Sequence, residues 1–400
     1  MEKTNQLLRK GVQMLCRDSI EIGPEVDLNR ISGEGVLIHS GCRISGNDTF
    51  IAAGAKLGTE GPVAVENCLI GPGVELKGGF FKDSVFLAGS RCGSGSHVRE
   101  STILEERSSI AHSVGLKQTI LFPFVTLGSL INFCDCLMAG GTDRKNHSEV
   151  GSSYIHFNFT PNQDKATPSL IGDVPRGVML NQRPIFLGGQ GGMVGPVRLN
   201  FGTTVAAGTI LRKDELRPNR LIFGGAGKGG NIEYRPGRYS GASRIIKNNL
   251  FYIANLLALR QWYREVRSLF VGERFPEPLL AGLTLNIQKV IDERTKRLKE
   301  FGDKMAASGD PSLFERWPAI EQVLADRNEH RGNDRLRELF QEKTSKAIAS
   351  VGKDYIAVIK ALSGEESEQG TAWLQGMVDE TVEAALGALK CSRQDATPTI

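Results

Sequence analysis

The 400-residue sequence lacks a hydrophobic segment long enough to cross a lipid bilayer. Its longest apolar run, residues 250–259, is interrupted by Asn255, whereas a membrane-spanning helix needs about 20 apolar residues. The first residues contain neither a long apolar core nor a small-residue cleavage site, so we predict no signal peptide. Together these absences predict a protein without a membrane partner.

The chain also lacks a strong imbalance of charge. It has 49 Lys and Arg against 45 Asp and Glu, which gives a formal net charge of +4. This charge is small for a chain of this size, so we expect no nucleic-acid partner. With 40% hydrophobic and 24% charged residues, the composition is that of an ordinary globular protein.

Cysteine is scarce and its number is odd, seven in all. Without an export signal, we expect these residues to be reduced thiols in the cytoplasm. Cys134 and Cys136 are expected to share one face of a strand. Because a lone Cys-x-Cys pair is a weak basis for a metal site, we expect structural thiols and no bound metal.

Glycine, by contrast, is abundant: there are 47 residues, which thin out after about residue 241. In this glycine-rich part the phrase Ile-Gly-Pro-x-Val occurs at residues 22–26 and 70–74, and aliphatic residues recur six positions apart. The pairs with this spacing include Ile38 and Ile44, Ile51 and Leu57, Ile70 and Leu76, and Val205 and Leu211. A period of six is typical of a β-helix built from hexapeptides, each forming one short strand and one corner.

The period predicts a mainly β protein in which residues 20–215 form a parallel β-helix of about ten coils, three hexapeptides to a coil. A β-sandwich of many short strands is the alternative, although sandwiches do not keep a period of six. Residues 1–19 are expected to form a helical N-terminal segment. Residues 216–243, which contain the run GGAGKGG, are expected to form a linker.

Beyond this linker the hydrophobic period becomes helical. Ile246, Leu250, Ile253 and Leu257 follow the i, i+4, i+7, i+11 spacing of one helix face. The sequence therefore predicts an α-helical C-terminal domain over residues 244–391 and a tail over residues 392–400. These helices are expected to cover the β-helix or to pack between subunits.

The six-residue repeat is interrupted at residues 131–173 by polar residues that include His147 and His156. Irregular backbone on a rigid scaffold is where functional residues concentrate, so this segment is the candidate site. Taken alone, either histidine is also explained by a hydrogen bond within a loop, and His112 by a corner of the β-helix.

The repeat and its Ile-Gly-Pro phrases resemble the hexapeptide-repeat acyltransferases, whose fold is a left-handed parallel β-helix. Within that superfamily, residues 151–173 are similar to the acetyltransferase domain of the bifunctional UDP-N-acetylglucosamine pyrophosphorylase/glucosamine-1-phosphate acetyltransferase. The matching text comprises Asn132-Phe133, Asn146-His147, Gly151-Ser152-Ser153-Tyr154, Asn158-Phe159-Thr160-Pro161, Lys165, Ile171-Gly172-Asp173 and Val205-Ala206-Ala207-Gly208-Thr209.

This resemblance implies that His147 is the general base, since an imidazole with a pKa of about 6.5 suits the deprotonation of an attacking amine. It also implies a site where acyl-CoA meets the sugar, with the cationic side chains free to bind phosphate. The implied substrate-binding residues are Asn132, Arg144, Lys145, Asn146, Tyr154, Asn158 and Lys165. The implied acyl-CoA-binding residues are Asn158, Ala207 and Thr209.

The function implied is transfer of an acetyl or other acyl group from CoA to an amino sugar phosphate or UDP-amino sugar. The resemblance also implies a homotrimer whose subunits share the sites. One departure from the family is that its sugar-binding arginine has no clear counterpart, Lys117 being the nearest residue. The missing arginine favours a first alternative, a non-catalytic β-helix that binds a nucleotide sugar or assembles partners.

A second alternative is a UDP-N-acetylglucosamine pyrophosphorylase, a nucleotidyltransferase. It requires a nucleotide-binding α/β domain with a glycine-rich loop followed by lysine, and we recognise no such segment. A zinc hydratase at a trimer interface is disfavoured, because His147 and His156 are nine residues apart and His112 is distant.

Overall fold

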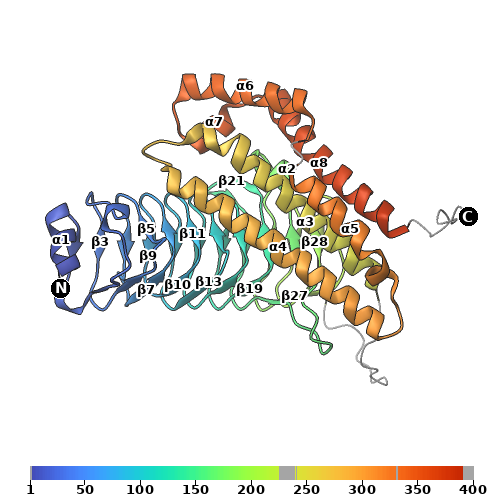
Figure 1. The fold of residues 1–400 in the computed structure, drawn as a ribbon, viewed down its shortest axis with the longest axis horizontal. Coiled ribbons are helices and arrows are strands. Elements are labelled where there is room, and N and C mark those ends of the chain that lie inside the picture. Colours follow the sequence, from blue (N-terminus) through green and yellow to red (C-terminus); the bar gives the residue numbers. More distant parts are fainter. Residues whose placement is uncertain (1, 225–238, 240, 330–331, 391–400) are drawn as a thin grey trace, which may run out of the picture.

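The structure is a computed structural model that describes residues 2–224, 239, 241–329 and 332–390. Two regions are visible in Figure 1. Short strands from the N-terminal half stack one behind the next, and the long helices of the C-terminal half lie along one side of the stack.

The strands form three parallel sheets, which we call sheets A, B and C. Sheet A consists of β1 (Gln13–Met14), β3 (Leu37–Ile38), β6 (Lys56–Leu57), β9 (Glu75–Leu76), β12 (Arg91–Cys92), β15 (Ser109–Ile110), β18 (Thr126–Leu127), β23 (Glu149–Val150), β26 (Phe186–Leu187), β29 (Thr204–Val205) and β31 (Leu221–Ile222). Sheet B consists of β2 (Glu21–Ile22), β4 (Arg43–Ser45), β7 (Val63–Glu66), β10 (Gly79–Lys82), β13 (Ser96–Arg99), β16 (Gly115–Lys117), β19 (Asn132–Cys134), β24 (Ile155–Phe157), β27 (Gly192–Val194) and β30 (Ile210–Leu211). Sheet C consists of β5 (Phe50–Ile51), β8 (Leu69–Ile70), β11 (Val85–Phe86), β14 (Ile103–Leu104), β17 (Ile120–Leu121), β20 (Cys136–Met138), β25 (Ser169–Ile171) and β28 (Arg198–Leu199).

The chain visits the sheets in turn, which makes a parallel β-solenoid and confirms the predicted fold class. In sheet A the second residue of each strand points inward and stacks on its copy in the next coil, as Ile38 does on Leu57 and Leu57 on Leu76. Coils stack about 4.8 Å apart, so each aliphatic side chain packs above and below. Sheet A has 11 strands, close to the predicted number of coils.

The first strand, β1, lies before the predicted start at Ile20, and helix α1 (Glu2–Lys10) packs against the first coil through Leu7, which is fully buried. The last strand, β31, lies inside the segment predicted as a linker. The rest of that segment, residues 225–238 and 240, and the tail at 392–400 lie outside the described residues, so the domain limits stay predictions.

The expectation that Cys134 and Cys136 share one face of a strand is wrong. Cys134 ends β19 in sheet B, and Cys136 begins β20 in sheet C. Asp135 forms the corner between them with a φ of 60°, a left-handed conformation. Cys136 is buried in the interior, whereas Cys134 is partly exposed on the other sheet.

The C-terminal half is helical, as predicted. A four-residue helix, α2 (Val174–Gly177), precedes it within the solenoid, and the long helices follow. They are α3 (Ala242–Glu265), α4 (Glu277–Ala307), α5 (Ser312–Glu329), α6 (Asp334–Val351), α7 (Tyr355–Ala361) and α8 (Gly364–Lys390). Among the helices that the structure describes, none combines the length and apolar character that a membrane crossing requires.

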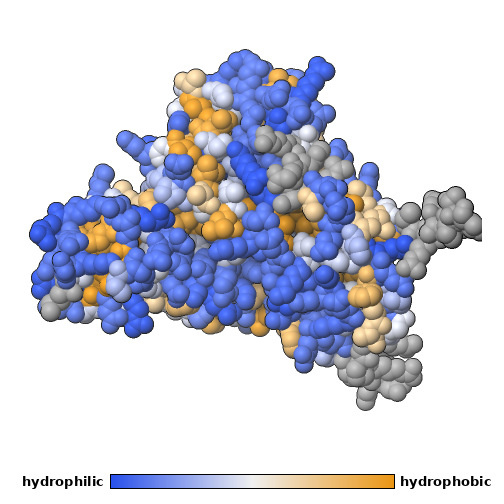
Figure 2. Space-filling view, in the orientation of Figure 1, coloured by the Kyte–Doolittle hydropathy of each residue, from blue (hydrophilic) through white to orange (hydrophobic). Residues whose placement is uncertain are grey.

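Helices α3 and α4 pack on sheet C. The approach is close: a Cβ added at Gly282 of α4 would lie 1.8 Å from Cδ1 of Leu69 on β8, so glycine is needed there. In Figure 2 the visible face of the solenoid is mostly hydrophilic, and hydrophobic residues gather around the helices. Sheet C is therefore the face that the helices cover, while sheets A and B carry exposed side chains such as Lys56 on sheet A and Phe157 on sheet B.

Candidate functional site

The predicted interruption of the repeat contains a small hairpin. Strand β21 (Gly141–Asp143) pairs antiparallel with β22 (Asn146–His147), between β20 of sheet C and β23 of sheet A. Gly141 has a φ of +101°, and a Cβ there would lie 2.5 Å from Cα of His147. At the tip, Oδ1 of Asp143 accepts hydrogen bonds from the backbone N–H of Lys145 (2.8 Å) and Asn146 (3.2 Å). The bond from Lys145 is the main reason that the pKa of Asp143 is lowered.

His147 ends this hairpin and is partly exposed. Its Nδ1 is buried and has no hydrogen-bond partner among the described residues. The next residue, Ser148, is fully buried; its hydroxyl donates to the carbonyl of Ala139 (2.8 Å) and accepts from the N–H of Ile185 (2.9 Å). The base of the hairpin is thus fixed to the solenoid, and the imidazole projects from a rigid position.

Arg144, at the hairpin tip, lies back over the preceding coils. Its Nη1 donates to the carbonyl of Arg107 (3.0 Å), the carbonyl of Phe124 (3.3 Å) and the hydroxyl of Thr126 (3.0 Å). Partial burial lowers the pKa of this guanidinium. Arg144 therefore fastens the hairpin to the solenoid, and the neighbouring Lys145 is also exposed.

His156 and Tyr154 lie in the interior of the solenoid, at 3% and 0% exposure. Nε2 of His156 is 2.8 Å from the hydroxyl of Ser169, and burial lowers the pKa of His156 to about 4. The Tyr154 ring packs edge-on against Phe133, and burial raises its pKa. Both side chains belong to the core, so in this arrangement neither reaches a ligand in solvent.

The loop from β24 to β25 carries Asn158 and Lys165 at the corner between sheets B and C. Nδ2 of Asn158 donates weakly to Oδ2 of Asp135 at 3.5 Å. Asp135 also forms a buried ion pair with Arg294 of α4, 3.1 Å long, and Arg294 donates to the carbonyl of Lys165. The side chain of Lys165 is exposed.

The remaining predicted residues lie elsewhere. Asn132 is exposed on the outer face of sheet B. Ala207 is exposed and Thr209 is buried in the turn between β29 and β30, at the corner between sheets A and B. Lys117, on sheet B, pairs with Glu100 at 3.2 Å.

Within one chain, the predicted residues thus form separate groups at different corners of the solenoid. Residues 144–147 lie together in the hairpin. Asn158 and Lys165 lie in the loop from β24 to β25, and Ala207 and Thr209 lie in the turn between β29 and β30. The sequence did not single out Ser148 or Asp135, although these two residues hold the hairpin and the loop in place. Over the part of the chain that the structure describes, no group of three or more His, Cys, Asp or Glu side chains could hold a metal ion.

Three parallel sheets with a six-residue repeat and an inserted polar hairpin define a β-solenoid of the hexapeptide-repeat class. The chain is similar to several proteins named bifunctional protein GlmU, which confirms the resemblance seen in the sequence. It is 28% identical to the protein of Pelobacter propionicus over 190 residues, 47% of this chain and 37% of the relative. The corresponding values are 27% over 204 residues for Acaryochloris marina (51% and 39%) and 26% over 209 residues for Synechococcus elongatus (52% and 41%).

The chain therefore spans about two fifths of the length of these curated relatives. No protein-family model matches it.

Proposed function

We propose that this protein transfers an acyl group from an acyl-CoA, acetyl-CoA in the first place, to the amino group of an amino sugar phosphate or UDP-amino sugar. The observation that carries the proposal is His147, a partly exposed imidazole on a rigid hairpin at the predicted interruption of the repeat. The similarity to GlmU over about half the chain supports the same proposal.

In the proposed reaction the amine nitrogen attacks the thioester carbonyl, and a nitrogen–carbon bond forms as an electron pair moves to the carbonyl oxygen. His147 accepts the proton that the amine loses. Backbone N–H groups of an irregular turn stabilise the oxyanion. When the intermediate collapses, the carbon–sulfur bond breaks, and the CoA thiolate leaves and takes up a proton. The amide and free CoA are the products.

The assembly that we propose is a homotrimer. Sheet C carries the helices, so sheets A and B are the faces left for contacts between subunits. Large apolar side chains are exposed on these two faces at neighbouring coils: Ile155 (43%) and Phe157 (41%) on β24, and Phe186 (40%) on β26. A heterologous threefold contact joins face A of one subunit to face B of the next, so residues from different corners can contribute to one site.

The trimer is tested by light scattering after size-exclusion chromatography. Phe157→Glu places a charge in the proposed contact and should shift the mass from trimer to monomer. Phe314→Glu, the same change at an exposed phenylalanine on helix α5, away from sheets A and B, is the control and should leave the mass unchanged. A wild-type monomer would contradict the trimer.

The enzymatic proposal is tested by thiol release from acetyl-CoA with a panel of amino sugar phosphates and UDP-amino sugars. His147→Gln should lower kcat/KM by about 10²- to 10⁴-fold. His112→Gln is the matched control, since His112 is exposed at another corner of the solenoid, where its Nδ1 lies 2.8 Å from the hydroxyl of Ser129, and the change should affect turnover little. No thiol release by the wild type with any acceptor, or full activity of His147→Gln, would contradict the proposal.

A non-catalytic β-solenoid that binds a nucleotide sugar is the second candidate. It is favoured by two observations: Arg144 is committed to the solenoid, and no described carboxylate orients Nδ1 of His147. Ligand-induced stabilisation distinguishes the two, because a ligand at 100 times its Kd adds about 2.7 kcal/mol. Stabilisation by CoA supports the transferase, and stabilisation by UDP-sugar alone supports the binding protein.

The pyrophosphorylase activity remains the third candidate, and release of pyrophosphate from UTP and a sugar 1-phosphate would be its sign. A cytoplasmic location also remains a prediction. It is supported by the free thiols of the six described cysteines, which are Cys16, Cys42, Cys68, Cys92, Cys134 and Cys136.

A further inference from the structure

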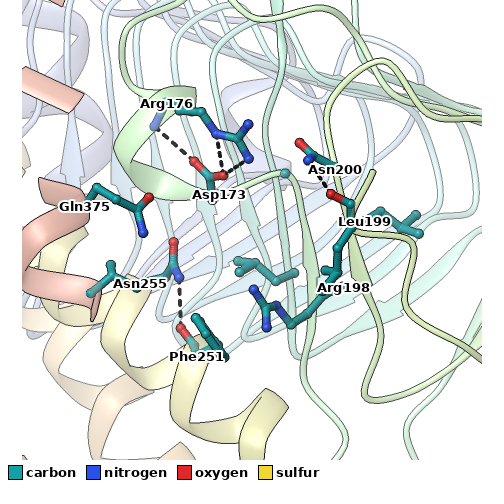
Figure 3. Close-up of a pocket in the computed structure, with 12 residues that line it drawn as sticks. Asp173, Arg176, Arg198, Leu199, Asn200, Phe251, Asn255 and Gln375 are labelled. Atoms are coloured by element: carbon teal, nitrogen blue, oxygen red, sulfur yellow. Dashed lines mark hydrogen bonds and ion pairs between the residues drawn. The ribbon is translucent and has the colours of Figure 1, made fainter. Parts of the chain in front are cut away.

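A polar cavity of about 220 Å³ lies where the last coils of the solenoid meet the helices. Figure 3 shows its walls: Arg176 comes from α2, Arg198 and Asn200 from β28 and its end, Asn255 from α3, and Gln375 from α8. None of these residues belongs to the site proposed above. The cavity is therefore a separate feature, built from both halves of the chain.

Arg198 is the unusual group in this cavity. Its guanidinium stacks on the ring of Phe251 from α3, 3.6 Å from the ring centroid. Its side chain has no hydrogen bond or ion pair to any residue that the structure describes, and burial lowers its pKa. The nearby Asp214 is engaged by the backbone N–H of Arg198 (3.0 Å) and the amide of Asn248 (2.9 Å). Asp214 and Asp173 attract this guanidinium electrostatically, but neither makes a hydrogen bond or ion pair with its side chain among the described residues. A partly desolvated guanidinium without a hydrogen-bonded partner is costly, so its free N–H groups favour a bound anion.

Arg176 faces the same space from the other side (Figure 3). It pairs with Asp173 through Nε (2.8 Å) and Nη2, and its guanidinium lies 4.9 Å from the centroid of Phe201. Nη1 of Arg176 has no hydrogen-bond partner among the described residues. Asp173 is also the N-cap of α2, where Oδ1 accepts from the N–H of Arg176 (3.0 Å). Because the Asp173 oxygens accept hydrogen bonds from Arg176, Asp173 attracts Arg198 only through space and makes no hydrogen bond with it.

The charged residues of the lining are Arg176, Arg198 and Asp173, so the cavity keeps an excess of positive charge. Its amide side chains are already oriented by the fold. Nδ2 of Asn255 donates to the carbonyl of Phe251 (2.8 Å), and Nδ2 of Asn200 to the carbonyl of Leu216 (2.7 Å). Nε2 of Gln375 donates to Oδ1 of Asp379 (2.8 Å). The charged donors of the cavity that lack a hydrogen-bond partner among the described residues are thus N–H groups of the two guanidiniums, on either side of a space that admits a small molecule.

We propose that this cavity binds a small phosphate monoester, with the phosphate between Arg198 and Arg176. A tetrahedral dianion has enough oxygens to accept hydrogen bonds from both guanidiniums, and forked guanidinium donors match phosphate geometry. The amides of Asn200, Asn255 and Gln375 provide polar surface for the hydroxyl groups of the organic part. The bound ligand would touch β28, α2, α3 and α8, and would therefore link the solenoid to the helices.

The test is calorimetric titration of the full chain, at constant ionic strength, with inorganic phosphate, a hexose 6-phosphate and acetate. We expect the hexose phosphate to bind more tightly than phosphate, and acetate to bind weakly. Arg198→Met keeps an apolar side chain over Phe251 but removes the charge, and should weaken hexose phosphate binding by about 10-fold or more. Arg43→Met, on an exposed surface pair with Glu21 in sheet B, is the control and should not change it.

Gln375→Glu is the second variant, because it adds a carboxylate to the cavity wall without touching the solenoid. It should also weaken binding, even if Arg198→Met does not fold. Three outcomes would overturn the proposal: no binding of either phosphate by the wild type, equal binding by wild type and Gln375→Glu, or tighter binding of acetate than of the phosphates. Circular dichroism of each variant verifies that it is folded.

Discussion

The interior of the solenoid and its junction with the helices are held together by different interactions. Inside the solenoid, aliphatic side chains stack from coil to coil, and buried hydroxyls donate to carbonyls near the corners, as Ser84 does to Lys82 (2.7 Å) and Thr102 to Arg99 (2.7 Å). At the junction, by contrast, whole charges are buried. Arg267 and Arg294 are 1% and 2% exposed and pair with carboxylates of the solenoid.

The larger of these charged clusters forms where α3 ends. Arg267 pairs with Glu106 and lies over the ring of Tyr355, 3.7 Å from its centroid. The hydroxyl of Tyr263 on α3 donates to Oε1 of Glu105 at 2.6 Å. Packing between aliphatic side chains is not directional and allows a helix to dock in several positions. A buried ion pair forms only when the helix is in one position. We infer that the charges specify where the helices dock more than they add stability.

The largest expected effect in this comparison is the loss of Arg267. Arg267→Met leaves Glu105 and Glu106 buried without their cation, and breaking a buried pair costs about 3–5 kcal/mol. Urea unfolding followed by circular dichroism measures the change. Arg43→Met removes a pair of similar chemistry, Arg43 with Glu21, but exposed, and should cost less than about 1 kcal/mol. Equal losses in the two variants would mean that the buried cluster has no special role.

The second effect is a dependence of stability on pH. Burial raises the pKa of Glu105 from 4.5 to about 7, opposed by Arg267 and reinforced by Glu106. The folded protein therefore binds this proton more tightly than the unfolded chain does. The contribution is present below about pH 4.5 and is lost as the pH rises to about 7. The Glu105→Gln variant has no carboxyl group at this position, so its stability lacks this dependence on pH.

Urea unfolding from about pH 5 to about pH 8 should thus show the wild type losing stability relative to Glu105→Gln, on the order of 1 to 3 kcal/mol. The difference should level off above about pH 7. A difference that is constant across this range, or that grows in favour of the wild type, would contradict a raised pKa.

The same contrast explains how much of the fold could be predicted. Spacing alone gave the solenoid, because every coil repeats the same inward aliphatic and so leaves a period in the sequence. The corners between strands were harder to recognise in the sequence than the strands themselves. In the five consecutive coils from β7 to β20, the corner between sheets B and C is a left-handed residue other than glycine: Asn67, Asp83, Ser101, Gln118 and Asp135, with φ from 46° to 60°. Because position 135 is aspartate and not glycine, the sequence does not mark a corner there, and residues 134–136 were predicted to belong to one strand.

The candidate site was predictable only in part, for a related reason. The interruption of the repeat predicted irregular backbone around His147, and the structure has a hairpin inserted there. Whether a side chain points in or out depends on strand register, which a broken period does not reveal. Tyr154, which the resemblance implied as a substrate-binding residue, and His156, which belongs to the same polar segment, are both buried. The docking of Arg294 on Asp135 joins residues far apart in the chain, and no local pattern signals it.

A smaller effect is expected where the two regions are alike, in their apolar interiors. Ile70 of β8 is fully buried and stacks on Ile51 and Phe86 in the neighbouring coils. Ile287 of α4 is also fully buried. Ile70→Val and Ile287→Val should each cost about 0.5–1.5 kcal/mol in urea unfolding. A much larger loss for Ile70 would show that a defect in one coil propagates to its neighbours.

The smallest effect is expected for exposed ion pairs, in either region. Lys82 lies 2.7 Å from Glu66 on the adjacent strand of sheet B, and Lys346 pairs with Glu342 one turn away on α6. Both pairs are solvent-accessible, so Lys82→Met and Lys346→Met should each change the free energy of unfolding by no more than about 0.5 kcal/mol. Added salt should reduce even this difference. If either variant instead lost as much as Arg267→Met, surface charge would hold the molecule together, and burial would no longer distinguish the junction from the rest.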